Sequence, residues 1–180
     1  MRRLERLLIV ATCAVVIGVP AQTIAAPQSE YGQFVAPADL GRFTSVTPGG
    51  AGLPPGQGDA IQGREVFANQ CVACHGEKLE GVKGTGGLAL VGGRGTLGSA
   101  KPFKTVESYW PYATTVFDYV RRAMPFNAPG SLSDDEVYAV TAYILASGDV
   151  IKFSDRLDAT TLAKVAMPNR DGFFTDPRPK

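Results

Sequence analysis

The sequence is poor in the residue types that bind metals: it has one histidine, three cysteines and three methionines among 180 residues. It also lacks an excess of charge of either sign, because 18 Lys and Arg stand against 17 Asp and Glu, a formal net charge of +1. This balance excludes the strongly basic surface used by nucleic-acid-binding and polybasic membrane-binding proteins. With 44% hydrophobic residues, the length allows one globular domain with extensions rather than two full domains.

The N-terminus has the pattern of an export signal. A start rich in arginine is followed by an apolar run, Leu7–Val19, that is shorter than the ~20 residues needed for a membrane span. Small residues then offer cleavage after Ala21, with Ala25 as an alternative. We therefore expect a signal peptide at residues 1–21, a periplasmic protein, and no stable membrane span after cleavage.

Cleavage would remove Cys13 and leave two cysteines, both in the segment Cys71-Val72-Ala73-Cys74-His75. This C-x-x-C-H pattern is typical of c-type haem attachment. Residues three and four positions apart lie on one face of a helical turn, so both thiols and the imidazole can address one planar group. The sequence therefore predicts one haem c, covalently bound through Cys71 and Cys74, with His75 as an axial ligand of the iron.

Other uses of this motif fit the sequence poorly. A zinc site needs about four protein ligands, and the chain has no second histidine and, after cleavage, no third cysteine. A thioredoxin-like pair requires a βαβ context, whereas the surrounding residues have helical and glycine-rich patterns. A disulfide between cysteines so close in sequence is strained and constrains very little of the chain.

The second axial ligand has to be sought among the methionines, because no histidine remains. Met124 follows a helical pattern and precedes Pro125, which ends a helix. Met167 lies in the polar C-terminal part and is interpreted as core filler. We predict Met124 as the ligand, since Met/His ligation is a standard arrangement of haem c and suits electron transfer rather than catalysis at the iron.

Two long helical patterns frame the haem motif. In Ala60–Cys71, Gly63 and Phe67 share a face with Cys71, and the small Gly63 favours a close helix crossing. The last strong helix begins with the capping box Ser133–Glu136 and ends at Gly148. Its apolar stripe consists of Val137, Val140, Tyr143 and Ile144. This helix is the natural partner for the face of Gly63 and Phe67.

Weaker signals predict the remaining elements. Thr114 or Thr115 can cap a short helix that runs through Arg122, and a further short helix is expected near residues 161–165. A Gly- and Pro-rich composition marks residues 22–58 as an extended arm. The predicted division is a signal peptide at 1–21, this arm, a haem domain at 59–150, and a C-terminal extension at 151–180.

A glycine-rich loop, residues 81–98, follows the haem motif. It has no P-loop Lys-Ser/Thr sequence, so we interpret it as backbone that wraps the edge of the haem. Arg94 in this loop is a candidate to pair with a haem propionate, or it is solvated. Trp110 and Tyr109 are candidates for propionate hydrogen bonds, or they pack in the core.

Over residues 60–148 the chain resembles the class I c-type cytochromes. The resemblance rests on Gly63-x-x-x-Phe67-x-x-x-Cys71, the C-x-x-C-H motif, Met124-Pro125 and the terminal helix. It implies an all-α fold with helices packed around one haem. Such cytochromes usually have a proline after the haem motif, near the carbonyl that receives the histidine Nδ1–H. This chain has Gly86-Gly87-Leu88-Ala89-Leu90 there, so the accepting carbonyl is not identified by the resemblance.

A narrower resemblance, to the cytochrome subunit of sulfur (sulfane) dehydrogenase, covers most of the mature chain. It rests on residues 90–97, 108–115, Met124-Pro125 and 167–173. The resemblance implies an electron donor, a molybdenum-containing sulfite or sulfur dehydrogenase subunit, and a downstream respiratory cytochrome or oxidase. The family often has a second haem domain, which this sequence lacks.

Three functions compete at this stage. The first is an electron-transfer subunit for such a dehydrogenase, with the N-terminal arm and the C-terminal tail as candidates to wrap the partner. The second is a freely diffusing periplasmic electron carrier, which needs little beyond the haem domain. The third is an enzyme acting at the iron, such as a peroxidase, which requires an open sixth coordination position. Ligation by Met124 argues against the third.

Overall fold

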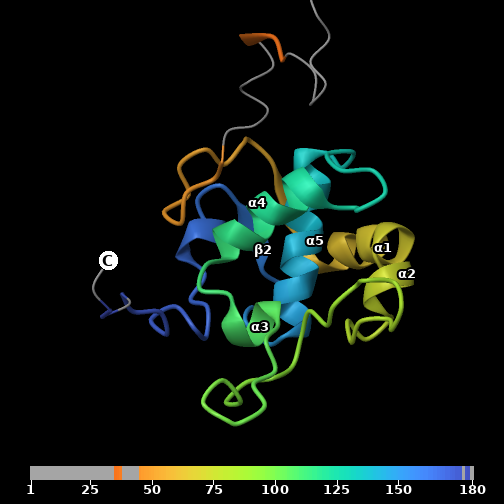
Figure 1. The fold of residues 1–180 in the computed structure, drawn as a ribbon. Helices are drawn as coiled ribbons and strands as arrows, with labels where there is room; N and C mark the ends of the chain where they lie inside the picture. Colours follow the sequence, from red (N-terminus) through yellow and green to blue (C-terminus); the bar gives the residue numbers. More distant parts are fainter. Residues whose placement is uncertain (1–34, 38–44, 176, 179–180) are drawn as a thin grey trace, which may run out of the picture. The chain divides into compact units, whose positions relative to one another are not determined.

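The computed structural model describes residues 35–37, 45–175 and 177–178, and the helices and strands named below lie between Gln57 and Lys164 (Figure 1). The predicted signal peptide at 1–21 and much of the predicted arm lie outside the described residues. In order along the chain, the elements are β1 (Gln57–Asp59), α1 (Ala60–Gln70), α2 (Val72–His75), α3 (Val106–Tyr109), α4 (Ala113–Ala123), α5 (Asp134–Ser147), β2 (Arg156–Asp158) and the 3₁₀ turn η2 (Leu162–Lys164).

Helices α1 and α5 cross in close contact, as predicted. A Cβ atom on Gly63 would lie 1.8 Å from the carbonyl oxygen of Ala139, so only glycine allows this approach. One turn further on, the ring of Phe67 packs on the ring of Tyr143, with centroids 5.2 Å apart. The shared face of α1 therefore fixes the crossing.

Helix α5 begins and ends as predicted. Ser133 and Glu136 form the capping box, because the Ser133 hydroxyl accepts from the N–H of Glu136 and the Glu136 carboxylate accepts from the N–H of Ser133. Gly148 is the C-terminal cap. In the predicted stripe, Val137, Val140 and Ile144 are buried and Tyr143 is half-buried, and residues on the other sides of α5 are buried too. This helix is therefore covered on most of its surface by the rest of the chain.

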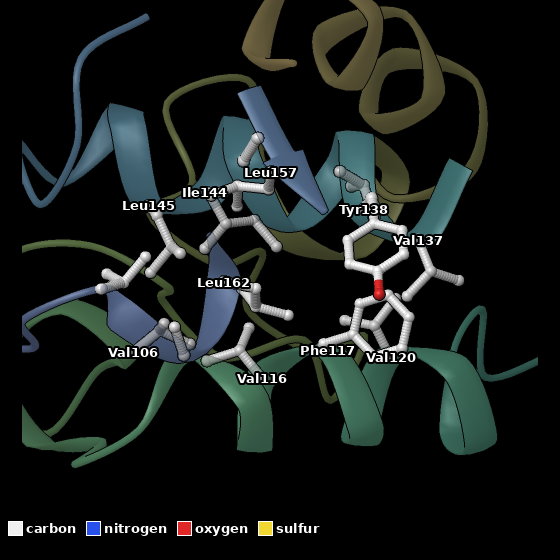
Figure 2. Packing of buried hydrophobic residues seen from close by; sticks show 14 of the residues in the cluster. Val106, Val116, Phe117, Val120, Val137, Tyr138, Ile144, Leu145, Leu157 and Leu162 are labelled. Carbon is white, nitrogen blue, oxygen red and sulfur yellow. The ribbon is translucent and has the colours of Figure 1, made fainter. Parts of the chain in front are cut away.

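The main core lies between α4 and α5 (Figure 2). The ring of Phe117 from α4 packs on Tyr138 from α5, with centroids 4.4 Å apart, and both residues are fully buried. Leu162 of η2 reaches into the space between the two helices. Met167 is also buried, at 4% exposure, which confirms its assignment to the core.

The predicted cap of α4 is wrong. The helix begins at Ala113 after Tyr112, with no side-chain cap among the described residues, and Thr114 lies inside its first turn. The Thr114 side chain is buried, and its hydroxyl donates to the carbonyl of Pro48, 3.1 Å away. A long-range hydrogen bond has therefore taken the place of the local one expected from the sequence.

Residues 46–59 pack against the helices. The N–H of Val46 donates to Oδ1 of Asp118 at 3.0 Å, and the hydroxyl of Tyr138 donates to the carbonyl of Pro54 at 2.9 Å. Strand β1 then pairs antiparallel with β2, with Gly58 opposite Leu157. This two-stranded ribbon is the one sheet of the described residues, and its strand β1 contains the predicted boundary between arm and haem domain. Within the described ranges, no helix has both the length and the apolar character needed to cross a membrane.

Candidate haem site

The predicted haem-binding residues lie on one helical turn. Cys71 caps the N-terminus of α2, and its carbonyl accepts from the N–H of Cys74 at 3.1 Å and from the N–H of His75 at 2.9 Å. Gly76, with φ of 78°, ends the helix directly after His75. The two thiols and the imidazole are thereby held by one short, well-defined turn.

Both cysteines are partly buried, and neither is in a disulfide. Burial, and to a lesser extent the neighbouring Cys74, raises the pKa of Cys71 to about 11. Cys71 packs against the hydrophobic core, which accounts for this burial.

The imidazole of His75 is oriented by a backbone carbonyl. Its Nδ1 lies 2.8 Å from the carbonyl oxygen of Leu88, and a carbonyl only accepts, so Nδ1 carries the proton. In the neutral imidazole with this tautomer, Nε2 has the lone pair that a haem iron binds. The carbonyl that accepts from His75, which the sequence did not identify, is therefore that of Leu88.

The backbone around Leu88 approaches α2 closely. A Cβ atom on Gly87 would lie 2.1 Å from the carbonyl oxygen of Cys74. The same carbonyl accepts from the N–H of Val82 at 2.9 Å, and the carbonyl of His75 accepts from the N–H of Gly81 at 2.7 Å. Glycine and these hydrogen bonds place the Leu88 carbonyl without the usual proline.

Met124 is the C-terminal cap of α4, with its N–H donating to the carbonyl of Val120 at 3.1 Å. Its side chain is half-buried and packs against the core cluster. The structure thus places Met124 at a helix end beside the core. Its ligation to the iron stays a prediction.

The residues predicted to meet propionates have protein partners. Arg94 Nε lies 2.8 Å from Oε1 of Glu107, and its guanidinium also donates to the carbonyl of Gly148. The half-buried Trp110 ring packs edge-on against Tyr119, with centroids 5.7 Å apart. Propionate contacts of Arg94 and Trp110 stay predictions.

Glu107 is a residue that sequence reasoning missed. It lies in α3, a four-residue helix that begins with a capping box formed by Thr105 and Ser108. That Thr-x-x-Ser pattern was a visible signal, but it is weaker than the Ser-x-x-Glu pattern of α5. No local pattern links Glu107 to Arg94, because the two are brought together by the loop that follows α2.

Comparison with known proteins identifies the family. A profile of the cytochrome c family matches residues 60–147. The crystal structure of the sulfane dehydrogenase SoxCD from Paracoccus pantotrophus is similar at a TM-score of 0.75 and 40% sequence identity, and the match covers 83% of this chain and 73% of that one. The chain belongs to the cytochrome c family. Its fold is the class I cytochrome c fold, as predicted.

A second relative of this cytochrome c is the thiosulfate dehydrogenase of Stutzerimonas stutzeri (strain A1501). The two are 28% identical over 93 residues, which is 51% of this chain. The matched part is only 28% of the length of that enzyme. The similarity therefore concerns a part of the thiosulfate dehydrogenase.

Membership of the cytochrome c family implies a covalently bound haem c, and the chemistry of the site fits this group. Two thiols and an imidazole with a free Nε2 lie on one turn. Half-buried apolar side chains adjoin the hydrophobic core on this turn (Val72), in the loop after it (Leu90 and Val91), and at the ends of α3 (Trp110) and α4 (Met124). Such side chains suit contact with a large apolar ring system.

Proposed function

We propose that this cytochrome c is a periplasmic, single-haem electron-transfer subunit. In this proposal it accepts electrons from a molybdenum-containing sulfite or sulfur dehydrogenase subunit and passes them to a respiratory cytochrome or oxidase. The cytochrome itself is not the site of substrate oxidation.

The observation that supports the subunit role is the extent of the similarity to the sulfane dehydrogenase. The match covers 83% of this chain, whereas the cytochrome c profile is confined to residues 60–147, about half of it. The likeness at 40% identity thus extends into the segments that flank the haem domain. A freely diffusing carrier has no need for those segments, so their retention favours a fixed partner.

In the proposed site, Cys71 and Cys74 hold the haem through thioethers, and His75 and Met124 bind the iron. When bound, the haem supplies one-electron transfer. The carbonyl of Leu88 keeps the proton on Nδ1 of His75 and so leaves Nε2 for the iron. Met124, as a thioether ligand, raises the reduction potential and keeps small molecules from the iron.

Exposed aromatic side chains in the C-terminal extension support a docking role for the tail. Phe174 is 88% exposed and Phe173 is 52% exposed. The tail is nevertheless anchored, because Nδ2 of Asn169 donates to the carbonyl of Tyr109 at 2.7 Å and Phe173 packs edge-on against the Tyr109 ring. An anchored segment that still presents aromatic rings suits contact with a partner protein.

The test is reduction of the purified holo-protein by sulfite, and separately by thiosulfate, with and without the molybdenum dehydrogenase of the same cell. Haem reduction that requires this enzyme is the expected result. Equal reduction by unrelated dehydrogenases would instead favour a general diffusible carrier. No reduction by either compound with the enzyme present would contradict the proposal.

A pair of variants tests the docking role of the tail. Phe174→Ser should slow reduction by the dehydrogenase at low protein concentration, because it removes an aromatic contact from the tail. Ile61→Ser is the matched control, since Ile61 is also an exposed apolar residue, at 59%, but lies on α1. Equal rates for the two variants would show that the tail is not the contact.

A further inference from the structure

The loop that orients His75 has little intrinsic rigidity. Between the haem motif and α3 it contains Gly86, Gly92 and Gly93, all with φ between 82° and 90°. Glycine at such positions gives the unfolded or locally open chain many alternative backbone conformations. The Leu88 carbonyl can hold the imidazole steadily only if other groups fix the loop.

Glu107 fixes the loop just beyond Leu88. Its backbone N–H donates to the carbonyl of Leu90 at 3.3 Å, and its carboxylate Oε2 accepts from the N–H of Gly92 at 2.5 Å. One residue of α3 thus holds two points of the loop, two and four positions after Leu88. The hydroxyl of Thr105 adds a further contact, donating to the carbonyl of Gly92 at 2.7 Å.

The other carboxylate oxygen of Glu107 is engaged as well. Oε1 lies 2.8 Å from Nε of Arg94, and the guanidinium of Arg94 donates to the carbonyl of Gly148 at the end of α5. The Glu107 side chain is 13% exposed, whereas that of Arg94 is 45% exposed. The largely buried carboxylate of Glu107 therefore connects α3 to the loop directly and, through Arg94, to the end of α5. Its hydrogen bonds are charge-assisted.

From this arrangement we infer that Glu107 is a positioning residue for the haem iron, acting through the 88–92 segment on the hydrogen bond between Leu88 and His75. This inference rests on the proposed site, in which His75 is the iron ligand. A firm acceptor on Nδ1–H raises the basicity of a ligating histidine and lowers the reduction potential of its iron. In this role Arg94 acts by holding Glu107, which differs from the direct propionate contact predicted from the sequence.

The experiment compares four holo-proteins by reduction potential and by exchange of the His75 Nδ1 proton, followed by NMR. Glu107→Gln keeps an oxygen that can accept from Gly92 but loses the ion pair, and Glu107→Ala loses both side-chain contacts. Arg94→Met removes the ion pair and leaves the carboxylate on Gly92. Asp134→Asn is the matched control, because it removes another arginine–carboxylate pair, Arg121–Asp134 at 2.8 Å, at the opposite end of α5.

We expect the potential to become more positive, and the Nδ1 proton to exchange faster, in Glu107→Gln and more so in Glu107→Ala. Arg94→Met should show a smaller change than Glu107→Ala, and Asp134→Asn should match the unaltered protein. Should Glu107→Ala fail to fold, the Gln variant decides. Unchanged potential and exchange in the Glu107 variants would overturn the inference, as would a larger shift in Arg94→Met than in Glu107→Ala.

Spectra of the unaltered holo-protein distinguish a wrong role for Glu107 from a wrong assignment of His75 as the iron ligand. An absorption and NMR spectrum without histidine ligation in the unaltered holo-protein would contradict the assignment of His75. A normal spectrum together with silent Glu107 variants would leave that assignment intact and remove only the positioning role of Glu107.

Discussion

Substitution of Gly63 by alanine should strongly destabilise the fold, because α1 and α5 meet at this residue. The added Cβ would lie 1.8 Å from the carbonyl oxygen of Ala139, 2.4 Å from its carbonyl carbon and 2.8 Å from Cβ of Tyr143. Two of these atoms belong to the backbone, so no side-chain rotation relieves the clash. The helices have to separate by more than an ångström, and the Phe67–Tyr143 contact opens with them.

The size of the effect follows from two opposing contributions. Overpacking of a tight interface costs roughly 1–3 kcal/mol and sometimes more, and the short distances place Gly63→Ala at the upper end. Alanine regains about 1 kcal/mol because it favours the helix more than glycine does. We expect a net loss of about 2 kcal/mol in unfolding free energy, or a fall in Tm of roughly 4–8 °C for a chain of this size.

The assay is thermal and urea unfolding of the holo-protein, followed by far-UV circular dichroism. Gly98→Ala is the matched control, because a Cβ at Gly98 has no atom within 4 Å. That variant should unfold as the unaltered protein does, or slightly later. A Gly63→Ala protein that unfolds within 0.5 kcal/mol of Gly98→Ala would refute the reasoning about the helix crossing.

Further variants test the ligand and three buried hydroxyls. Met124→Ala should lower the reduction potential by a sizeable part of the ~0.8 V range that axial ligands span and let carbon monoxide bind; an unchanged spectrum would mean that Met124 is not a ligand. Tyr138→Phe should cost about 1 kcal/mol, because it leaves the Pro54 carbonyl without its donor. Burial raises the pKa of Tyr138 from 10.0 to about 12, so the stability that the protonated Tyr138 provides is complete below pH 10 and is lost as the pH rises toward 12. Urea unfolding measured across that range should show a smaller fall of the unfolding free energy with pH in the Phe variant. An equal fall in both proteins would contradict this. Thr141→Val should raise the unfolding free energy by about 1 kcal/mol, since the buried Thr141 hydroxyl has no hydrogen-bond partner among the described residues. Thr114→Val breaks a hydrogen bond to Pro48 and should lower the unfolding free energy. A change of the same sign for both variants in urea unfolding would contradict these two predictions.

The sequence predicted the features of the fold that have a local signature. Helix α1 follows from the four-residue spacing of Gly63, Phe67 and Cys71, and α5 from its capping box and Gly148. The haem motif is local as well, since all three groups lie within five residues. These patterns predict the structure correctly because, in the folded protein, the residues have the same roles as in an isolated helix: capping its ends and sharing one face.

Features that depend on distant partners were not predictable in this way. Thr114 has the residue type of a helix cap, yet its hydroxyl bonds Pro48, far away in sequence. Strands β1 and β2 have three residues each, too few for an alternating pattern to appear. The Leu88 acceptor is a backbone oxygen, which every residue has, and the Arg94–Glu107 pair exists only once the loop has folded.

The pairing of the two ends of the domain also bears on the order of events during biosynthesis. Gly63 of α1 contacts Ala139 of α5, and Gln57 of β1 pairs with Asp158 of β2. The first strand and the first long helix therefore have their partners late in the sequence. Contacts of such long sequence separation form late, because loop closure has to precede them. We expect the segment of Cys71 and Cys74 to stay accessible in the newly made chain until α5 and β2 are available, which gives covalent modification a time window before the domain closes.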